Sequence, residues 1–163
     1  MTDIHFTVGD TDEAISIIRE AAQWLTDSGK PMWHLDELTP ERLVKPDNEF
    51  MTLWRGDESA ATLILSFYDP FFWPDVGPGE SGFIHKLAVR RKFAGQGLAE
   101  ALIRHTADLC RERGIPALRL DCDPHRPKLC AFYESVGFRL TEVRAIETKR
   151  LGVIDLAMYR MEV

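Results

Sequence analysis

Apolar and polar residues show two different patterns of spacing along the chain. Between residues 11 and 26 the apolar positions recur three or four apart, which predicts a helix with one buried face. That face comprises Ala14, Ile15, Ile18, Ala21, Ala22 and Leu25. Asp10 or Thr11 is a candidate cap at its start, and Gly29 with Pro31 ends it.

Shorter apolar runs bounded by turn residues predict strands. We expect strands at residues 4–8, 50–55, 60–68, 83–89, 117–122, 138–144 and 153–161. Gly56-Asp57-Glu58 fits a hairpin turn between the second and third of them. Further helices are expected at residues 39–44, 97–113 and 128–136, the first with Pro40 at its first helical position.

The predicted order is strand, two helices, three strands, helix, strand, helix, two strands. It indicates a mixed α/β fold, with a strand–helix–strand crossover at its centre. The 163 residues fit a single domain over residues 1–163. The final sheet should hold about six or seven strands flanked by about four helices.

Charge, hydropathy and cysteine content disfavour several classes of function. A net charge of −6 disfavours a nucleic-acid partner, which needs a basic footprint. No apolar run approaches the roughly 20 residues of a membrane helix, and the acidic start does not read as a signal peptide. Three cysteines, Cys110, Cys122 and Cys130, include no Cys-x-x-Cys pair. We therefore expect a cytoplasmic protein with reduced thiols, no membrane partner and no metal.

A glycine turn at Gly95-Gln96-Gly97 joins a predicted strand to a predicted helix. A Walker loop is excluded, because Leu98 and Ala99 stand where lysine and a hydroxyl residue are needed. The dinucleotide-binding motif Gly-x-Gly-x-x-Gly is also not matched, because its third glycine is missing here. Two interpretations stay open on these residues alone: a pyrophosphate held by backbone amides at a helix N-terminus, or a plain tight turn.

A second motif follows about 36 residues later, where Tyr133-Glu134 precedes Gly137-Phe138. With both motifs in this order, the sequence resembles the GNAT superfamily of acyl-CoA-dependent N-acetyltransferases. That family has Gln/Arg-x-x-Gly-x-Gly/Ala and, later, Tyr-Glu-x-x-Gly-Phe. Two departures are that Lys92 stands where the family usually has Gln or Arg, and that Arg126 stands where many members have Asn.

The resemblance implies acetyl-CoA as co-substrate. It implies that the backbone amides from Phe93 to Leu98 hold the pyrophosphate and that the Val89 amide polarises the thioester carbonyl. The expected cofactor-binding residues are Leu87, Ala88, Val89, Lys92, Phe93, Ala94, Gly95, Gln96, Gly97, Leu98 and Arg126. Because the turn is about two residues shorter than the common pattern, Arg90 or Arg91 is an alternative to Lys92 at a phosphate.

Transfer to an amine releases a thiolate, and Tyr133 is the candidate proton donor. The general base has three candidates. Asp121 lies on the strand beside the site, and some family members carry a catalytic Glu at the matching place. His85 has an unperturbed pKa near 6.5 and, by strand alternation, shares a face with Leu87 and Val89. The third candidate is a chain of water molecules.

The acceptor groove is expected from two aromatic, acidic loops. Trp33 belongs to one, and Phe72 and Trp73 belong to the other. Aromatic faces with nearby carboxylates suit an ammonium group, although such loops also simply cover a core.

The expected reaction is direct acetyl transfer to a primary amine of a small molecule or peptide, by a monomer or homodimer. The alternatives are a longer acyl group, a protein acceptor, or a non-catalytic acyl-CoA-binding module.

Overall fold

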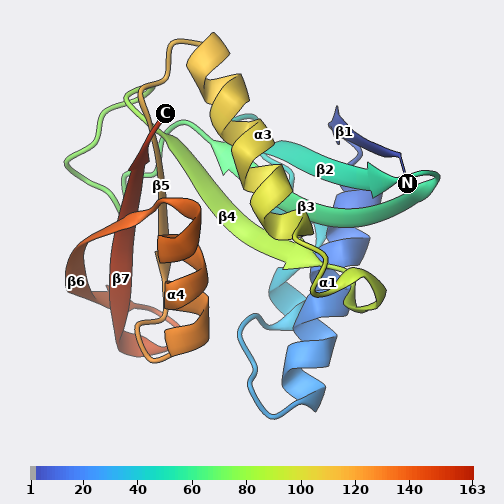
Figure 1. The fold of residues 1–163 in the computed structure, drawn as a ribbon. Coiled ribbons are helices and arrows are strands. Elements are labelled where there is room, and N and C mark those ends of the chain that lie inside the picture. Colours follow the sequence, from blue (N-terminus) through green and yellow to red (C-terminus); the bar gives the residue numbers. More distant parts are fainter. Residues whose placement is uncertain (1–2) are drawn as a thin grey trace. The chain divides into compact units, whose positions relative to one another are not determined.

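A computed structural model describes residues 3–163, and its elements follow the predicted order (Figure 1). The helices are α1 (Thr11–Asp27), α2 (Pro40–Leu43), α3 (Leu98–Glu112) and α4 (Pro127–Val136), with short 3₁₀ turns η1 (Leu35–Glu37) and η2 (Arg91–Phe93). The strands are β1 (Ile4–Val8), β2 (Glu49–Arg55), β3 (Glu58–Ser66), β4 (Gly82–Val89), β5 (Ala117–Cys122), β6 (Arg139–Thr148) and β7 (Gly152–Glu162).

Hydrogen bonding places these strands in one seven-stranded sheet, in the order β1-β2-β3-β4-β5-β7-β6. The chain divides into two compact units. The first unit holds the residues up to Ser66 and Ile84–Thr106, and the second holds Phe67–Phe83 and Ala107–Val163. The mixed sheet and its helices confirm the predicted fold class. The prediction of a single domain over the whole chain stays a prediction.

In the first unit, β1, β2 and β3 form an antiparallel meander. Gly56 turns the hairpin between β2 and β3 with a φ of 58°, a left-handed conformation that glycine adopts at no steric cost. Helix α1 lies against β2 and β3 (Figure 1). Its apolar stripe therefore faces the sheet, as its sequence periodicity predicts.

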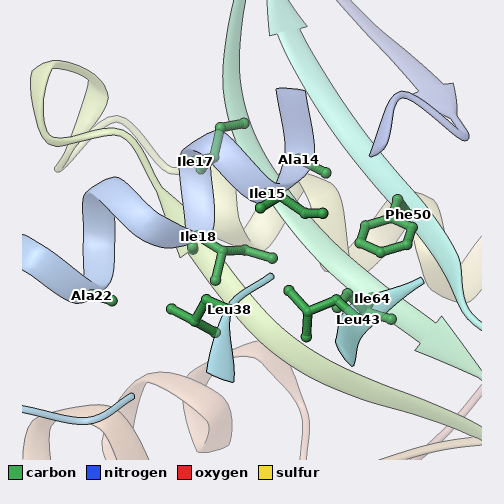
Figure 2. Packing of buried hydrophobic residues seen from close by; sticks show 10 residues of the cluster. Ala14, Ile15, Ile17, Ile18, Ala22, Leu38, Leu43, Phe50 and Ile64 are labelled. Atoms are coloured by element: carbon green, nitrogen blue, oxygen red, sulfur yellow. The ribbon is translucent and has the colours of Figure 1, made fainter. Parts of the chain in front are cut away.

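The core of the first unit forms between that stripe and the sheet. Ile17 and Ile18 are fully buried, and Figure 2 shows Ile18 beside Leu38. Each isoleucine buried in this way contributes about 1.5–3 kcal/mol to folding. The other buried members of this cluster are Ala14, Ile15, Ala22, Leu43, Phe50, Ile64 and Ala88. The sheet and α1 therefore form a packed scaffold for the turn that follows β4.

In the second unit, β7 pairs antiparallel with both β5 and β6. The first residues of β4 pair with β5 in parallel, with Gly82 opposite Leu118 and Phe83 opposite Arg119. Helix α4 packs against β6. A separate core forms from Trp73, Phe83, Leu156 and Met158, with Ile146 among the partly buried residues around it.

Several boundaries differ from those predicted. Strand β3 ends at Ser66 rather than at residue 68, and β6 runs on to Thr148 rather than residue 144. Pro40 does begin α2, but no side chain caps that helix. Asp10 occupies the cap position of α1, but its side chain makes no capping hydrogen bond; its carboxylate accepts a hydrogen bond from the Thr7 hydroxyl at 2.5 Å. Among the described residues, no helix is both long and apolar enough to cross a membrane.

Candidate active site

The glycine turn between β4 and α3 begins with a 3₁₀ turn. The amides of Phe93 and Ala94 donate to the carbonyls of Arg90 and Arg91, at 2.9 and 3.2 Å. These two amides are therefore occupied within the turn. The predicted cradle from Phe93 to Leu98 thus narrows to the amides from Gly95 onward.

Gly95 and Gly97 both adopt a left-handed backbone, with φ of 77° and 76°. A Cβ atom built on either glycine meets no heavy atom within 4 Å. In the part of the chain that the structure describes, the amides of Gly95, Gln96 and Gly97 have no backbone acceptor. Leu98 then begins α3, whose first amides are unpaired as in any helix. The turn thus offers several backbone donors beside open space.

The cations of the turn are already engaged within the first unit. Arg90 donates to the Ser59 carbonyl at 2.8 Å and pairs with Glu20 at 3.1 Å and Glu13 at 3.4 Å. The Arg91 guanidinium lies 4.0 Å from the centre of the Trp24 ring. Arg90 therefore anchors the turn to α1 and β3, which disfavours it as a phosphate ligand.

Lys92 is more accessible than Arg90. Its ammonium lies 2.5 Å from the Glu58 carboxylate, and both side chains are more than half exposed, at 59% and 57%. An exposed pair of this kind contributes roughly 0–1 kcal/mol and exchanges partners readily. Lys92 thus keeps the freedom to reach an incoming phosphate.

Sequence reasoning missed Arg55 at the end of β2. Its guanidinium donates to the Gln96 side-chain oxygen within the glycine turn. No motif marks this arginine, because the contact spans 41 positions and exists only once β2 and the turn are folded side by side. Arg55 adds a positive charge to the turn.

His85 lies on β4, with Nε2 3.0 Å from the Ser66 hydroxyl oxygen. Burial disfavours the charged ring, and with Lys86 and Lys45 nearby it lowers the pKa of His85 to about 4. This corrects the expectation of a pKa near 6.5. The imidazole is neutral at pH 7 but is a weak base.

The neighbouring Lys86 has a φ of 53°, which is unusual for a residue other than glycine. A left-handed residue inside a strand interrupts the alternation of side chains. The expectation that His85 shares a face with Leu87 and Val89 rested on that alternation, so it stays a prediction. The Lys86 ammonium lies 5.3 Å from the centre of the Trp33 ring.

Tyr133 lies in the second unit, on α4, and is 7% exposed. The centre of its ring lies 5.8 Å from the centre of the Phe138 ring, in an edge-to-face arrangement, and 6.3 Å from the centre of the Tyr159 ring. Burial, followed by the charges of Cys122, Asp121 and Cys130, raises the pKa of Tyr133. The phenol therefore carries its proton throughout the neutral range.

Asp121 comes from β5, where it is opposite Met158 of β7. Its negative charge contributes to the raised pKa of Tyr133. Arg126 occupies the cap position of α4, 3.7 Å from the Asp123 carboxylate and 22% exposed. The structure thus places Asp121 and Tyr133 in the same unit, and their roles as base and acid stay predictions.

The predicted acceptor residues have different surroundings. Trp73 is 4% exposed. The centre of its ring lies 6.1 Å from the centre of the Phe83 ring and 5.0 Å from the Arg119 guanidinium carbon. It is a core residue, which corrects its assignment to a groove wall. Phe72 packs at the edge of the same core, and its carbonyl accepts a hydrogen bond from Arg144 at 3.1 Å. Trp33 is partly buried against the core of the first unit.

The chain combines a mixed sheet, a glycine turn between a strand and a helix, and a second helix that ends in Tyr-Glu-x-x-Gly-Phe. Together these features define an acetyltransferase-like protein. The chain belongs to the GNAT family: the "Acetyltransferase (GNAT) family" model matches residues 16–138. It is therefore an acyl-CoA-dependent N-acetyltransferase by family.

A relative described as uncharacterized N-acetyltransferase YesJ, from Bacillus subtilis strain 168, is 27% identical over 141 residues. The matched region covers 79% of this chain and 76% of YesJ. These matches confirm the family resemblance that the two motifs predicted.

Solved structures share the fold. The ribosomal-protein-S18-alanine N-acetyltransferase of Escherichia coli has a TM-score of 0.68 at 21% identity, covering 98% of this chain and 94% of that one. A Bacillus subtilis acetyltransferase in complex with CoA has a TM-score of 0.66 at 17% identity, covering 100% and 99%.

Proposed function

We propose that this protein transfers an acetyl group from acetyl-CoA to a primary amine, by direct attack in a ternary complex. The observation that carries the proposal is the turn from Gly95 to Gly97 at the N-terminus of α3, where the amides have no backbone acceptor among the described residues and a built Cβ meets open space. Such a helix start binds phosphate through backbone donors and the helix dipole, without a metal. A solved relative of the same fold was crystallised with CoA, which supports this role.

The amides from Gly95 to Leu98 hold the pyrophosphate in this proposal, with Lys92 and Arg55 supplying positive charge nearby. The main chain from Leu87 to Val89 pairs with the pantetheine arm as an added strand does. The Val89 amide donates to the thioester carbonyl oxygen, where negative charge develops during attack. Arg126 is assigned to the cofactor arm by its position in the family pattern.

The neutral amine attacks the thioester carbonyl carbon, so a C–N bond forms as the C–S bond breaks. The leaving thiolate takes a proton from the Tyr133 hydroxyl. The raised pKa of Tyr133 keeps that proton in place at neutral pH, but it also makes the transfer more uphill. A position beside the sulfur atom must offset this cost.

Asp121, His85 and a chain of water molecules all stay candidates for the base. With a pKa of about 4, His85 is no stronger a base at neutral pH than an ordinary aspartate, whose unperturbed pKa is about 3.9. The Asp121 carboxylate lies in the same unit as Tyr133, the proposed acid. The contact of His85 with Ser66 also fits an orienting role.

Calorimetry with acetyl-CoA tests the cradle. We expect the wild-type protein to bind and Gly97→Trp to weaken binding at least about tenfold, which is 1.4 kcal/mol, because the indole fills the open space. Gly114→Trp is the matched control, since Gly114 also has a left-handed φ of 74° and no neighbour within 4 Å of a built Cβ. Equal losses in both variants, or no binding by the folded wild-type protein, would contradict the proposal.

Thiol release then separates an enzyme from a binding module. We expect CoA to appear when acetyl-CoA and a suitable amine are mixed with the wild-type protein. Binding without release across a broad panel of amines and peptides would favour the non-catalytic alternative. A parallel series with longer acyl-CoA thioesters identifies the acyl group that this chain prefers.

A further inference from the structure

In the part of the chain that the structure describes, strand β6 is the last strand in the sheet order and has β7 as its one neighbour. It is ten residues long, contains no proline, and none of its residues is buried. Figure 1 shows β6 beside β7 and α4, within the second unit. A long exposed edge of this kind presents unpaired amides and carbonyls, and it readily pairs with another strand.

The same edge exposes apolar side chains. Leu140 is 49% exposed and Val143 is 55% exposed. Both line an open groove of about 320 Å³ between β6 and α4, together with Pro127, Ala131 and Tyr159. Contiguous exposed apolar surface rimmed by charges is typical of a protein interface.

The charges of β6 indicate which partner fits. Glu142 and Arg144 flank Val143, and Arg144 donates to Glu142 within the strand. A two-fold axis perpendicular to the sheet at Val143 places each Glu142 opposite the other copy's Arg144. An axis at Arg144 or at Glu142 would instead place like charges opposite each other, which is destabilising.

We propose that a second copy of this chain docks on this edge, with β6 pairing antiparallel to β6 and Val143 on the two-fold axis. Such an interface is isologous, because the same strand serves both copies. A perpendicular axis keeps both grooves on one face, so the two valines and Leu140 side chains form a shared apolar strip. The irregularity between Leu140 and Glu142 limits the regular ladder, so we expect a short interface.

Sedimentation velocity over a range of concentrations tests the pairing. We expect reversible association to twice the chain mass of 18.6 kDa. Val143→Lys should weaken association at least about tenfold, because it brings two ammonium groups together at the axis. Val8→Lys is the matched control, since Val8 is 52% exposed on β1, the strand at the other end of the sheet order.

Charge reversal makes the register specific. Glu142→Arg or Arg144→Glu alone should weaken the dimer, and the double variant should restore it, because the opposed pair is re-formed with its signs exchanged. Circular dichroism establishes that each variant is folded. A monomer at every concentration, loss of association in Val8→Lys but not in Val143→Lys, or failure of the double variant to recover would overturn the proposal.

A cross-link gives a positive signature of the axis. Residues opposite each other in antiparallel strands have Cα atoms about 4.5–5.5 Å apart, within the range of a disulfide. Val143→Cys should therefore form a dimer band under mild oxidation that thiol reduction removes. Val153→Cys, which is 67% exposed in the wild type but far from the axis along the hairpin, should not. An equal yield from both variants would also overturn the proposal.

Discussion

The glycine turn of the first unit and the surroundings of Tyr133 in the second perform their proposed roles by different physical means. The turn acts through its backbone: two left-handed glycines and the start of α3 present amides to open space. Tyr133 acts through its side chain, and burial sets its protonation. A backbone site follows closely from local sequence, whereas a buried side chain takes its chemistry from residues distant along the chain.

Removing the Tyr133 hydroxyl tests the side-chain half of this comparison and should have the largest effect. Tyr133→Phe should lower kcat about 10²–10⁴-fold with little change in acetyl-CoA binding, because general acid catalysis contributes that much. Steady-state kinetics and calorimetry together measure the separation. Phe132→Leu, a neighbour on α4, is the control for packing. A kcat unchanged in Tyr133→Phe would remove the tyrosine from the mechanism.

His85 provides a pH test of burial. Its pKa is about 4 in the folded protein against 6.5 when unfolded, so the unfolded chain binds the extra proton between these values. Stability therefore falls as pH drops from about 6.5 to 4, by on the order of 3 kcal/mol from this one group. Denaturant unfolding at several pH values should show a flatter profile for His85→Gln.

His125→Gln is the matched control for that profile, since the His125 side chain is 78% exposed. We expect the pH slope of this variant to follow the wild type. If His85→Gln kept the wild-type slope as well, burial of His85 would not be the source of the acid sensitivity.

Arg90 tests how firmly the turn is held to the rest of its unit. Arg90→Ala should lower the free energy of unfolding by about 2 kcal/mol, because charge-assisted hydrogen bonds to buried or half-buried groups contribute about 1.5–3 kcal/mol. Lys92→Ala removes only the exposed pair with Glu58 and should cost less than about 1 kcal/mol. Equal costs in urea unfolding would show that Arg90 anchors nothing.

A methyl group at the turn should have a smaller effect than the loss of Arg90. Gly95→Ala meets no neighbouring atom, so its cost arises from the left-handed φ alone, about 1–2 kcal/mol. Acetyl-CoA binding should weaken slightly, well short of the loss in Gly97→Trp. Thermal unfolding and calorimetry measure the two effects. A complete loss of binding would mean that the cradle tolerates no side chain at Gly95.

Much of the fold could be predicted from the sequence, because its signals are local. The periodicity of α1, the apolar runs of β1 and β5, and the turn at Gly56 all match the structure. The boundaries of β3 and β6 were less predictable, since a strand continues for as long as its neighbour pairs with it.

For the candidate site, the sequence by itself determined the two motifs, the family and the position of the glycine turn proposed as the cradle, because glycines at a helix start set the backbone conformation locally. Only the tertiary structure decided the low pKa of His85, the burial of Trp73 and the partners of Arg90 and Arg55. These properties depend on desolvation and on contacts between residues far apart in the chain. No local pattern carries that information, and folding alone brings those residues together.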